Sequence, residues 1–465
     1  MIGGVTGASL PGDTAKRQSG LAALTPSGRP VVPLAWAFYD FANTIFSYAV
    51  VSLAIGLWLL DHARFGAQYG NLAFSLAIVA SVGLNAIVSP ILGAFSDRAG
   101  GRRLPYLLFF TLLCIVPTAL IGFSPAFVGL LLFVVANFAY QAALIYYDAT
   151  LRTVSFPETR GKLSGIGVAI GYCGTIFIGL LIFLLDLPVP SIFFVAAALY
   201  GLFAIPLFLV VREAPTPGAV RPTARDAALA LTQLRTTIRN ARTVPGLGRF
   251  LLGRFFYSDA VNTIIVVMAI VATEAMGLTT TVANLILLSL AVVAVLASFG
   301  WGALVDRLGP KRTLLIILGS WAIGLVLGGI SLGVPGTPGL VMFLVAGAIL
   351  GSGLGGVQVA DRVLMVRLSP PEQLGAFFGL YGLVGKGSQV IGQLLYGAIT
   401  FLLLTSLGVG AYQVAVLSLL VTMLIGVWLV APVDDRWAGS GELPEDIVEA
   451  PPPRLAPDVS PLEPR

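Results

Sequence analysis

The sequence predicts an all-α membrane protein with twelve transmembrane helices, arranged as two parallel six-helix halves. Three observations support this fold class. Of the 465 residues, 57% are hydrophobic and only 11% are charged, with a mean hydropathy of +0.94, whereas soluble domains carry roughly 25% charged residues. Apolar stretches of about 20 residues recur, each long enough to cross a ~30 Å hydrocarbon core as a helix. Motifs of the first half also return in the second half.

The twelve predicted spans follow one another through short connections, except after the sixth. They lack the alternating pattern that is typical of membrane β-strands. The chain contains 54 glycines, which suits close helix packing in lipid, because small residues form such interfaces. The spans cover roughly residues 32–60, 72–95, 105–123, 126–148, 162–185, 190–211, 249–274, 280–304, 313–333, 338–361, 376–404 and 411–431.

The remaining segments divide the chain into five parts. Residues 225–242, in the linker, place apolar side chains on one helical face and arginines elsewhere. This helix lies either on the cytosolic membrane surface or in solvent; its apolar face comprises Leu231, Leu234, Ile238 and Ala241. The parts are a disordered cytosolic tail (1–31), a first bundle (32–211), a cytosolic linker (212–248), a second bundle (249–431) and a disordered, acidic, Pro-rich tail (432–465).

The distribution of lysine and arginine predicts the orientation. If both termini are cytosolic, the outer loops contain a single arginine, Arg64, and the other basic residues outside the spans lie in inner segments. The positive-inside rule therefore favours a multi-pass protein of the plasma (inner) membrane with both termini in the cytosol. The formal net charge of +5 then reflects topology and contact with anionic lipids. Since no basic stripe is interleaved with exposed aromatic residues, we expect no nucleic-acid partner.

Internal matches indicate that the two halves arose by duplication. The motif Asp-x-x-Asn-Thr-Ile occurs at Asp40 and again at Asp259, 219 residues later. "GAFSDRAGGRR" (93–103) matches "GALVDRLGPKR" (302–312) at a separation of 209, and residues 156–174 align with 370–388 at 214. Three matches in one order and with similar spacing indicate a repeat of six spans. Parallel halves of this kind place a substrate site at their interface, near the membrane midplane.

The paired loops resemble the signature loop of the major facilitator superfamily. Within that superfamily, "WAFYDFANTIF" (36–46), "YYDATLRTVSFPETRGKLSGIGVAIGYCG" (146–174) and "FFGLYGLVGKGSQVIGQLLYG" (377–397) resemble the autophagy-linked vacuolar effluxer-like family, also called the unknown major facilitator family. The resemblance covers about residues 33–431 and implies the major facilitator fold and a transport function; the eukaryotic vacuolar member exports amino acids. The loop residues are Gly93, Asp97, Arg98, Gly100, Arg102 and Arg103 in the first copy, and Gly302, Asp306, Arg307, Gly309, Lys311 and Arg312 in the second.

We expect these two loops to act as a conformational latch and not to bind solute. An aspartate near a neighbouring helix N-terminus and an arginine near a carboxylate can hold the cytosolic ends together in one of two states. We expect other polar groups near the cytosolic ends of spans to have structural roles. Asp148 and Arg152 suit an ion pair one helical turn apart, and Gln358 and Asp361 occupy a similar place in span ten.

Polar side chains deep inside spans are the candidates for binding solute or protons. An ionisable group at such depth costs at least about 2.5–3.5 kcal/mol on insertion scales, so it usually faces a cavity or a partner. For Asp40 the alternative is a hydrogen bond that packs two helices. Lys386 lies in span eleven, where the first half has Tyr172, and this asymmetry suggests a role with an asymmetric solute. The candidates are Tyr39, Asp40, Asn43, Gln141, Asp259, Asn262, Lys386, Gln389 and Gln393.

A zwitterionic amino acid would complete this set of charges. Spans one, seven and eleven all run outward from the cytosol, and the family resemblance implies that they line or border one cavity. The solute carboxylate would then face Lys386 and its ammonium Asp40 or Asp259, with Asn43 and Asn262 donating hydrogen bonds. A proton could replace the ammonium on one carboxylate and couple transport to pH. The alternative is that Lys386 is an internal counter-charge to the aspartates.

Other functional classes fit the sequence less well. The chain has one histidine, His62, and no constellation of nucleophile, base and metal ligands, so we expect no enzyme activity, metal or cofactor. A sensor would carry a large soluble domain, but the longest internal soluble segment has 37 residues. No ATP-binding loop occurs, so an ion gradient or the solute's own gradient must drive transport. We therefore expect a monomeric secondary active transporter of amino acids or a related zwitterion, with a multidrug or sugar exporter as alternatives and a non-transporting membrane sensor as a distant one.

Overall fold

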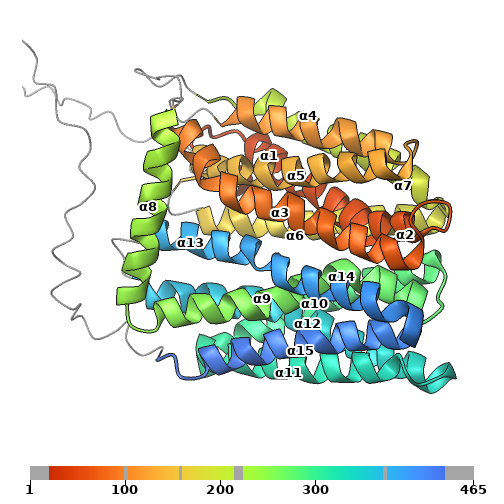
Figure 1. Cartoon of the computed structure of the whole chain (residues 1–465). Coiled ribbons are helices and arrows are strands. Elements are labelled where there is room, and N and C mark those ends of the chain that lie inside the picture. The colour runs from red at the N-terminus through yellow and green to blue at the C-terminus, as the bar shows by residue number, and fades with distance from the viewer. Residues whose placement is uncertain (1–19, 99–102, 157–159, 214–223, 370–373, 435–465) are drawn as a thin grey trace, which may run out of the picture.

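The computed structural model describes residues 20–98, 103–156, 160–213, 224–369 and 374–434. Every regular element in these ranges is helical (Figure 1). A short 3-10 helix, η1 Gly20–Leu24, precedes the first span. Residues 1–19 and 435–465 of the two predicted tails lie outside the described residues, so the predicted disorder of the tails stays a prediction.

The first half contains six spans. Span one is a continuous helical segment of three parts, α1 Val31–Phe46, the π-helical η2 Ser47–Ala54 and α2 Ile55–Leu60. The other five are α3 Gly66–Arg98, α4 Leu104–Ile121, α5 Ala126–Val154, α6 Arg160–Leu184 and α7 Val189–Val210.

The second half repeats this order and adds a break in its fifth span. Span seven consists of α9 Leu247–Ile270 and the π-helical η3 Val271–Ala275. Span eleven is divided at Ser388 into α13 Leu374–Gly387 and α14 Gln389–Leu407. The remaining helices are α10 Thr280–Leu308, α11 Pro310–Ser331, α12 Gly336–Leu368 and α15 Val409–Val430.

The described helices confirm the predicted all-α membrane fold. Eleven helical segments of the described chain are long and apolar enough to cross a membrane, and they overlap eleven of the predicted spans. The twelfth predicted span corresponds to α6, whose described apolar section, Ala169–Leu184, is shorter. The protein is therefore a multi-pass membrane protein with two sets of six helices joined by a linker.

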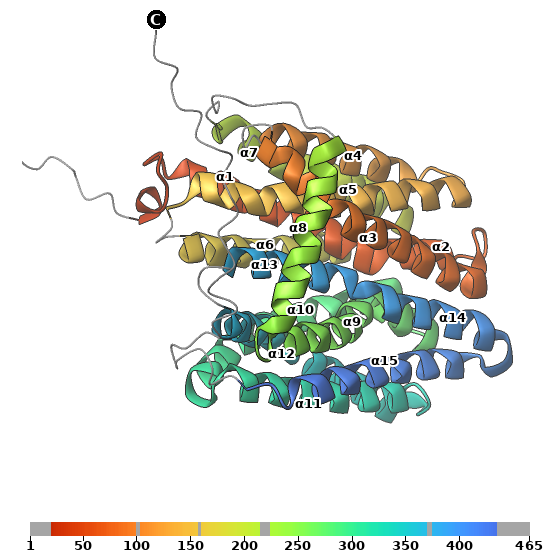
Figure 2. The same ribbon diagram turned by 60° about the vertical axis from the view of Figure 1, so that its left-hand side comes forward.

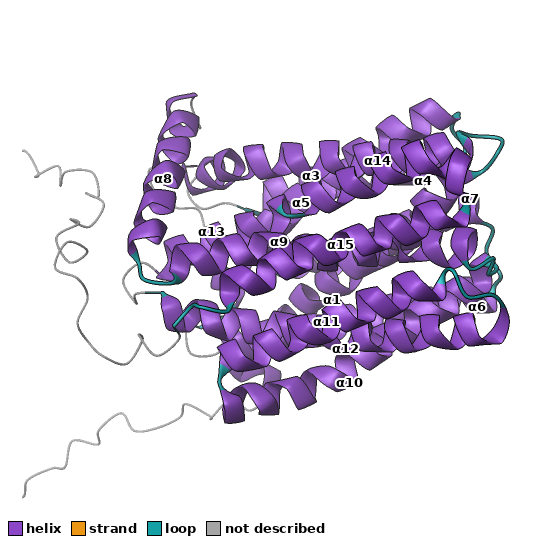
Figure 3. Ribbon diagram, turned by 60° about the horizontal axis from the view of Figure 1, so that its bottom comes forward, coloured by secondary structure: helices purple, strands orange, loops and turns teal. Residues whose placement is uncertain are grey.

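The two sets of helices lie side by side, and the axes of their helices point roughly along the same direction (Figures 1 and 3). Helices α1 to α7 gather in one bundle and α9 to α15 in the other. Two helix pairs form most of the boundary between the bundles, α3 with α14 and α6 with α10. Close approach depends on small residues, because a Cβ atom on Gly397 of α14 would lie 2.5 Å from the Cβ atom of Ser75 on α3.

The linker helix α8, Ala224–Thr243, agrees closely with the predicted 225–242. It runs across one end of the molecule, roughly at right angles to the spans (Figure 2). Leu234 and Ile238 are partly buried against the core and Ala241 is buried, with α3, α9 and α13 as neighbours; the side chain of Leu231 is outside the description. The apolar face thus packs on helices of both halves, a third arrangement besides the membrane surface and solvent that the pattern alone suggested.

Both motif-bearing spans change helix type at a similar place. In span one, η2 begins four residues after Asn43, and in span seven, η3 begins nine residues after Asn262. Short π-helical stretches are uncommon and are frequent at functional sites. The repeated motif is therefore followed in both halves by a distorted helix near the interface of the two halves.

Candidate functional site

A polar cavity of about 190 Å³ lies between the two halves. The first half contributes side chains from span one, α3 and α5, and the second half contributes side chains from α9 and α14. More than half of the lining residues are polar, and they include three of the predicted site residues. The lining comprises Ser47, Val51, Ser52, Ile78, Asn137, Tyr140, Gln141, Asn262, Ile265, Val266 and Gln389.

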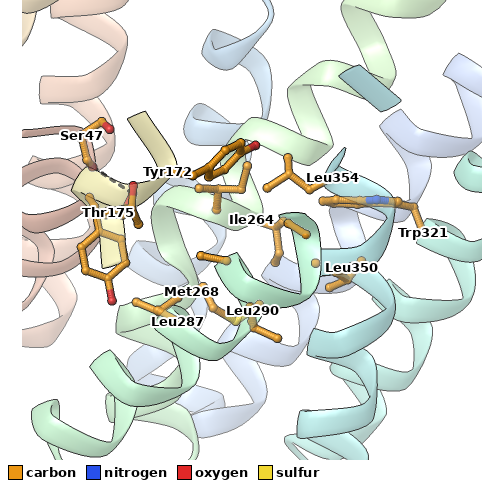
Figure 4. A pocket seen from close by; sticks show the side chains of 16 residues that line it. Ser47, Tyr172, Thr175, Ile264, Met268, Leu287, Leu290, Trp321, Leu350 and Leu354 are labelled. Atoms are coloured by element: carbon orange, nitrogen blue, oxygen red, sulfur yellow. Dashed lines mark hydrogen bonds between the residues drawn. The ribbon is translucent and has the colours of Figure 1, made fainter. Parts of the chain in front are cut away.

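A second cavity of about 190 Å³ adjoins the first and is mainly apolar. Ser47, Ser52 and Ile265 line both cavities. Figure 4 shows Ser47, Tyr172 and Thr175 on one side, opposite apolar side chains from the second half. The apolar lining includes Ile264, Met268, Leu287, Leu290, Trp321, Leu350 and Leu354. Together the cavities form a region with one polar and one apolar part.

Asp40 lies on α1 against a glycine of α6. A Cβ atom on Gly171 would lie 3.0 Å from Asp40 Oδ2, so this glycine leaves room for the carboxylate. Asp40 is partly buried, and no described residue donates a hydrogen bond to it. It is close enough to Asp148 of α5 for the two charges to repel. A cation or a proton near Asp40 would relieve this repulsion.

Tyr39 and Asn43 face the interior of the first bundle. The Tyr39 hydroxyl hydrogen-bonds to Thr111 of α4, and Tyr200 of α7 donates to Asn43 Oδ1 at 2.7 Å. Both Tyr39 and Asn43 are buried. These contacts hold α1 against α4 and α7. The side chains of Tyr39 and Asn43 thus face different helices from Asp40, which lies against α6.

Asp259 is held by span eleven. Its Oδ1 atom accepts the backbone N–H of Gly392 at 2.7 Å, and its side chain is fully buried. Oδ2 has no hydrogen-bond partner among the described residues. Asn262 donates to the carbonyl of Gly385 and the hydroxyl of Ser388, both at 3.4 Å, on either side of the break. The repeated motif of the second half thus supports the interruption between α13 and α14.

Lys386 reaches from the second half to the first. It lies near the end of α13, and its Nζ donates to the backbone carbonyl of Gln141 on α5 at 3.4 Å. Its charge also acts on Asp148, an exposed residue two turns further along α5. The predicted ion pair of Asp148 with Arg152 involves a side chain outside the described part of the chain. The sequence did not single out Asp148 as a candidate for this interface.

The other two polar candidates of span eleven lie at different depths. Gln389 lines the polar cavity, whereas Gln393 is fully buried and both its amide atoms lack described partners. Gln141 contributes both its backbone carbonyl to Lys386 and its side chain to the cavity wall. The polar cavity therefore brings together Gln141, Gln389 and Asn262, with Lys386 alongside.

A second charged cluster lies entirely within the second half. Arg254 of α9 forms an ion pair with Asp361 of α12 at 3.1 Å. Tyr381 donates to the other oxygen of Asp361 at 2.8 Å, and its ring lies 3.6 Å from the Arg254 guanidinium. Asp361 is 1% exposed, so this geometry supports the structural role expected for it. Arg254 was missed, although it precedes Asp259 by only five residues.

Much of the predicted latch falls outside the described structure. This applies to Gly100, Arg102 and the side chains of Asp97, Arg98 and Asp306, as well as to the surroundings of Gly93. In the second loop, Arg307 and Arg312 are exposed, Lys311 is partly exposed, and Gly309 has a φ of 85° at the junction of α10 and α11. The latch therefore stays a prediction.

The first loop nevertheless has one described carboxylate contact. The backbone N–H groups of Arg103 and Leu104 donate to the carboxylate of Glu213 at 2.8 to 3.0 Å. Glu213 follows α7 and thus places a negative charge at the N-terminus of α4, where the helix dipole favours it. This residue was not among the predicted loop partners.

Hydrogen bonds between the halves gather at the end opposite α8. Tyr48 donates to Asn284 Oδ1 at 2.7 Å, and Asn284 donates to the carbonyl of Gly179 at 2.9 Å. Further contacts join Asn71 with Tyr396 and Tyr412, Gln68 with Phe401, and Asp186 with Thr281. Among the described side chains, the Lys386 contact lies nearer α8 than these do. Most of the described hydrogen bonds between the halves thus lie at the end opposite α8.

Comparison with known proteins agrees with this architecture. Residues 153–436 match the family model described as vacuole effluxer Atg22 like, and residues 36–258 match that of the major facilitator superfamily. The uncharacterized MFS-type transporter YxiO of Bacillus subtilis is 27% identical over 86% of this chain and 94% of its own. Autophagy-related protein 22 of Coccidioides immitis is 28% identical over 51% of this chain, which spans only 44% of that relative.

Solved transporters share the fold at low sequence identity. The D-xylose-proton symporter has a TM-score of 0.67 and 13% identity over 88% of this chain and 98% of its own. The nucleoside transporter NupG has a TM-score of 0.62 and 14% identity over 86% and 98%. At such identities the likeness concerns the fold alone.

Proposed function

Because this chain belongs to the Atg22-like family of the major facilitator superfamily, we propose that it is a secondary active transporter of zwitterionic solutes such as amino acids. Transport occurs by alternating access of a site between the two halves. We further propose that the end with α8 faces the cytosol, together with both termini, and that the protein lies in the plasma membrane.

One observation supports this proposal: a cation of the second half acts on a carboxylate of the first half across the boundary between the halves. Lys386 of the second half hydrogen-bonds across the boundary to Gln141 and acts on Asp148 of the first half. The Asp148 carboxylate also repels the carboxylate of Asp40. Charges in a low-dielectric region are tolerated when they are paired, and a zwitterion brings one partner for each sign. Its carboxylate faces Lys386, and its ammonium faces Asp40 or Asp148.

The surroundings of the other motif residues refine their roles. Asn43 and Asp259 are engaged by Tyr200 and Gly392, respectively, so the ammonium is assigned to the aspartates of the first half. Gln141 and Gln389 line the polar cavity, and in this proposal they hydrogen-bond the solute carboxylate. A proton takes the place of the ammonium on Asp40 when the solute has left, which couples transport to pH.

The apolar cavity has a place in the same scheme. It adjoins the polar cavity through Ser47, Ser52 and Ile265 and is lined on the other side by leucine, isoleucine and methionine. A solute bound by its charged end at Lys386 would extend its uncharged part toward these side chains. Burial of an apolar group gains about 25 cal/mol per Å² removed from water, so affinity should rise with the size of the apolar part.

Binding and transport by the purified protein in liposomes test whether the solute carboxylate contacts Lys386. Lys386→Ala should weaken binding of an amino acid by roughly ten- to hundredfold, because a hydrogen bond to a charged group contributes about 1.5–3 kcal/mol. Binding of the corresponding amide, which lacks the carboxylate, should change far less. Lys16→Ala is the matched control, since it removes the same charge from the predicted N-terminal tail.

Two results would contradict the proposal. Equal losses for acid and amide would make Lys386 an internal counter-charge to Asp40 and Asp148. Transport of sugars or cationic dyes, with no response to any amino acid, would favour the sugar or multidrug alternative.

A further inference from the structure

The outward side of α8 presents a row of arginines. Arg235, Arg239 and Arg242 are spaced by four and three residues, so they lie on one helical face over about 10 Å. All three are exposed, and no described side chain pairs with them. We call these three residues the arginine face of α8.

The opposite side of α8 is fixed to the transmembrane helices. Leu234, Ile238 and Ala241 pack toward the core, and the neighbours of α8 are α3 from the first half and α9 and α13 from the second. Figure 2 shows α8 crossing the ends of both bundles. A ligand on the arginine face would therefore bind a helix that contacts both halves of the protein.

The described chain ends beside α8. Val433 is 1% exposed, and its Cγ1 atom lies 3.1 Å from the position of a Cβ atom on Gly246. Gly246 follows the last residue of α8, Thr243, by three positions. The described chain therefore ends close to the C-terminal end of α8, where the arginine face also ends.

The sequence after this point has the complementary charge. Residues 435–465 contain seven acidic residues and three arginines. Four of the acidic residues occur within one stretch of eight, at Glu442, Glu445, Asp446 and Glu449. We call residues 442–449 the acidic segment.

We propose that the acidic segment docks on the arginine face of α8 and restrains the inner ends of both halves. A connection of 8 to 15 residues that behaves as a random coil would have a root-mean-square span of about 15–23 Å. The distance from Thr243 to Arg235 along the helix is about 12 Å, so every arginine is within reach. A short tether also gives a local concentration in the millimolar range, which favours this segment over free anions. Docking here is independent of the solute and of its binding site.

Distance measurement between two spin labels tests this contact directly. The labels are placed at Thr236→Cys, beside the arginine face, and at Ile447→Cys, within the acidic segment. The exposed Cys173 is replaced by serine, and Cys114 is buried. The full chain is studied in discs of zwitterionic phosphatidylcholine. We expect a dominant distance shorter than the roughly 20 Å of a free connection. The distance should lengthen and broaden at about 1 M salt, where the Debye length falls to about 3 Å.

Charge variants distinguish docking from chance proximity. R235Q, R239Q and R242Q together should give the broad distribution even at low salt. Exchanging the signs, with glutamate at these three positions and lysine at the four acidic positions, should restore the short distance. A short distance that is indifferent to salt and to the arginines would overturn the proposal.

Anionic lipids are the competing occupant of the arginine face. Adding phosphatidylglycerol to the discs should lengthen the distance only partly if the acidic segment is the preferred ligand. A broad distribution in pure phosphatidylcholine, together with salt-sensitive protection of α8 by phosphatidylglycerol, would assign the face to lipid headgroups and overturn the proposal. None of these readouts uses transport, so failure here leaves the proposed function intact.

Discussion

The two halves of the protein treat equivalent aspartates differently. In the second half, Asp361 pairs with Arg254 and Tyr381, and Asp259 accepts the backbone N–H of Gly392. In the first half, Asp148 and Asp40 have no such partners among the described residues of their own half, and the cations that act on Asp148 are Lys386 and Arg362 from the other half. The duplication thus preserved the acidic positions while their partners diverged. The second half thus pairs its aspartates within the protein, whereas we propose that those of the first half are available for ligands.

Differences at two other equivalent positions explain this divergence. Subtracting the repeat spacing of 219 from Arg254 gives Ala35, and subtracting 214 from Tyr381 gives Gly167. The first half therefore lacks both the guanidinium and the phenol that enclose Asp361. A Cβ atom on Gly167 would lie 2.6 Å from the Trp36 ring, so α6 packs tightly on α1 at that position and leaves no space for a tyrosine.

The largest expected effect comes from breaking the ion pair of the second half. Arg254→Ala leaves the buried Asp361 carboxylate without its cation, which typically costs about 3–5 kcal/mol. We expect a large fall in the thermal unfolding midpoint of the purified protein in detergent. Arg249→Ala, on the same helix, is the control, because Arg249 is exposed and contacts Leu429 and the Trp428 ring. Similar losses for both variants would contradict a special role for the buried pair.

The first half should show the opposite behaviour, with a loss of binding in place of a loss of stability. Asp148→Asn should reduce amino-acid affinity roughly ten- to hundredfold, since a charge-assisted contact contributes about 1.5–3 kcal/mol, and should leave the unfolding midpoint nearly unchanged. The equivalent change, Asp361→Asn, should lower the midpoint. Equilibrium binding and thermal unfolding of both variants measure the contrast, and an exchange of the two outcomes would reverse the assignment of the halves.

A smaller effect is expected where Asp259 meets span eleven. A Cβ atom on Gly392 would lie 2.4 Å from Thr263 Oγ1 and 2.9 Å from Asp259 Oδ2. Gly392→Ala should therefore destabilise the protein by about 1–3 kcal/mol through overpacking. Gly382→Ala is the matched control, because nothing lies within 4 Å of its Cβ position. Equal midpoints for the two variants would show that α14 shifts freely relative to α9.

The fold was largely predictable because hydropathy and repetition act at the scale of whole helices. The twelve predicted spans correspond to helices, and even the linker helix, predicted at 225–242, is observed at Ala224–Thr243. Sequence alone did not reveal the break at Ser388, since the Gly385 carbonyl and the Ser388 hydroxyl accept hydrogen bonds from Asn262 of a distant span. A partner of this kind depends on tertiary packing and leaves no local pattern.

The candidate site was predictable only in part, for a related reason. Asp40, Asn43 and Tyr39 lie within one turn of each other. Different sides of span one, however, contact different helices. Asn43 and Tyr39 contact α4 and α7, whereas Asp40 faces α6. Asp148 was interpreted as structural because Arg152 lies one turn away, whereas the cations that act on it, Lys386 and Arg362, come from distant spans. The separation of 213 between Asp148 and Asp361 was the available signal.

In the proposed function, Asp148 and Lys386 act together on one zwitterionic solute. A double-mutant cycle of Asp148→Asn and Lys386→Gln, measured by equilibrium binding of an amino acid to the purified protein, tests it most directly. We predict that the two losses fall short of additivity by about 1 kcal/mol or more, whereas Asp361→Asn and Lys386→Gln combine additively to within about 0.5 kcal/mol. Additive losses for Asp148 and Lys386, with coupling between Asp361 and Lys386, would show that Asp148 and Lys386 do not bind one solute together.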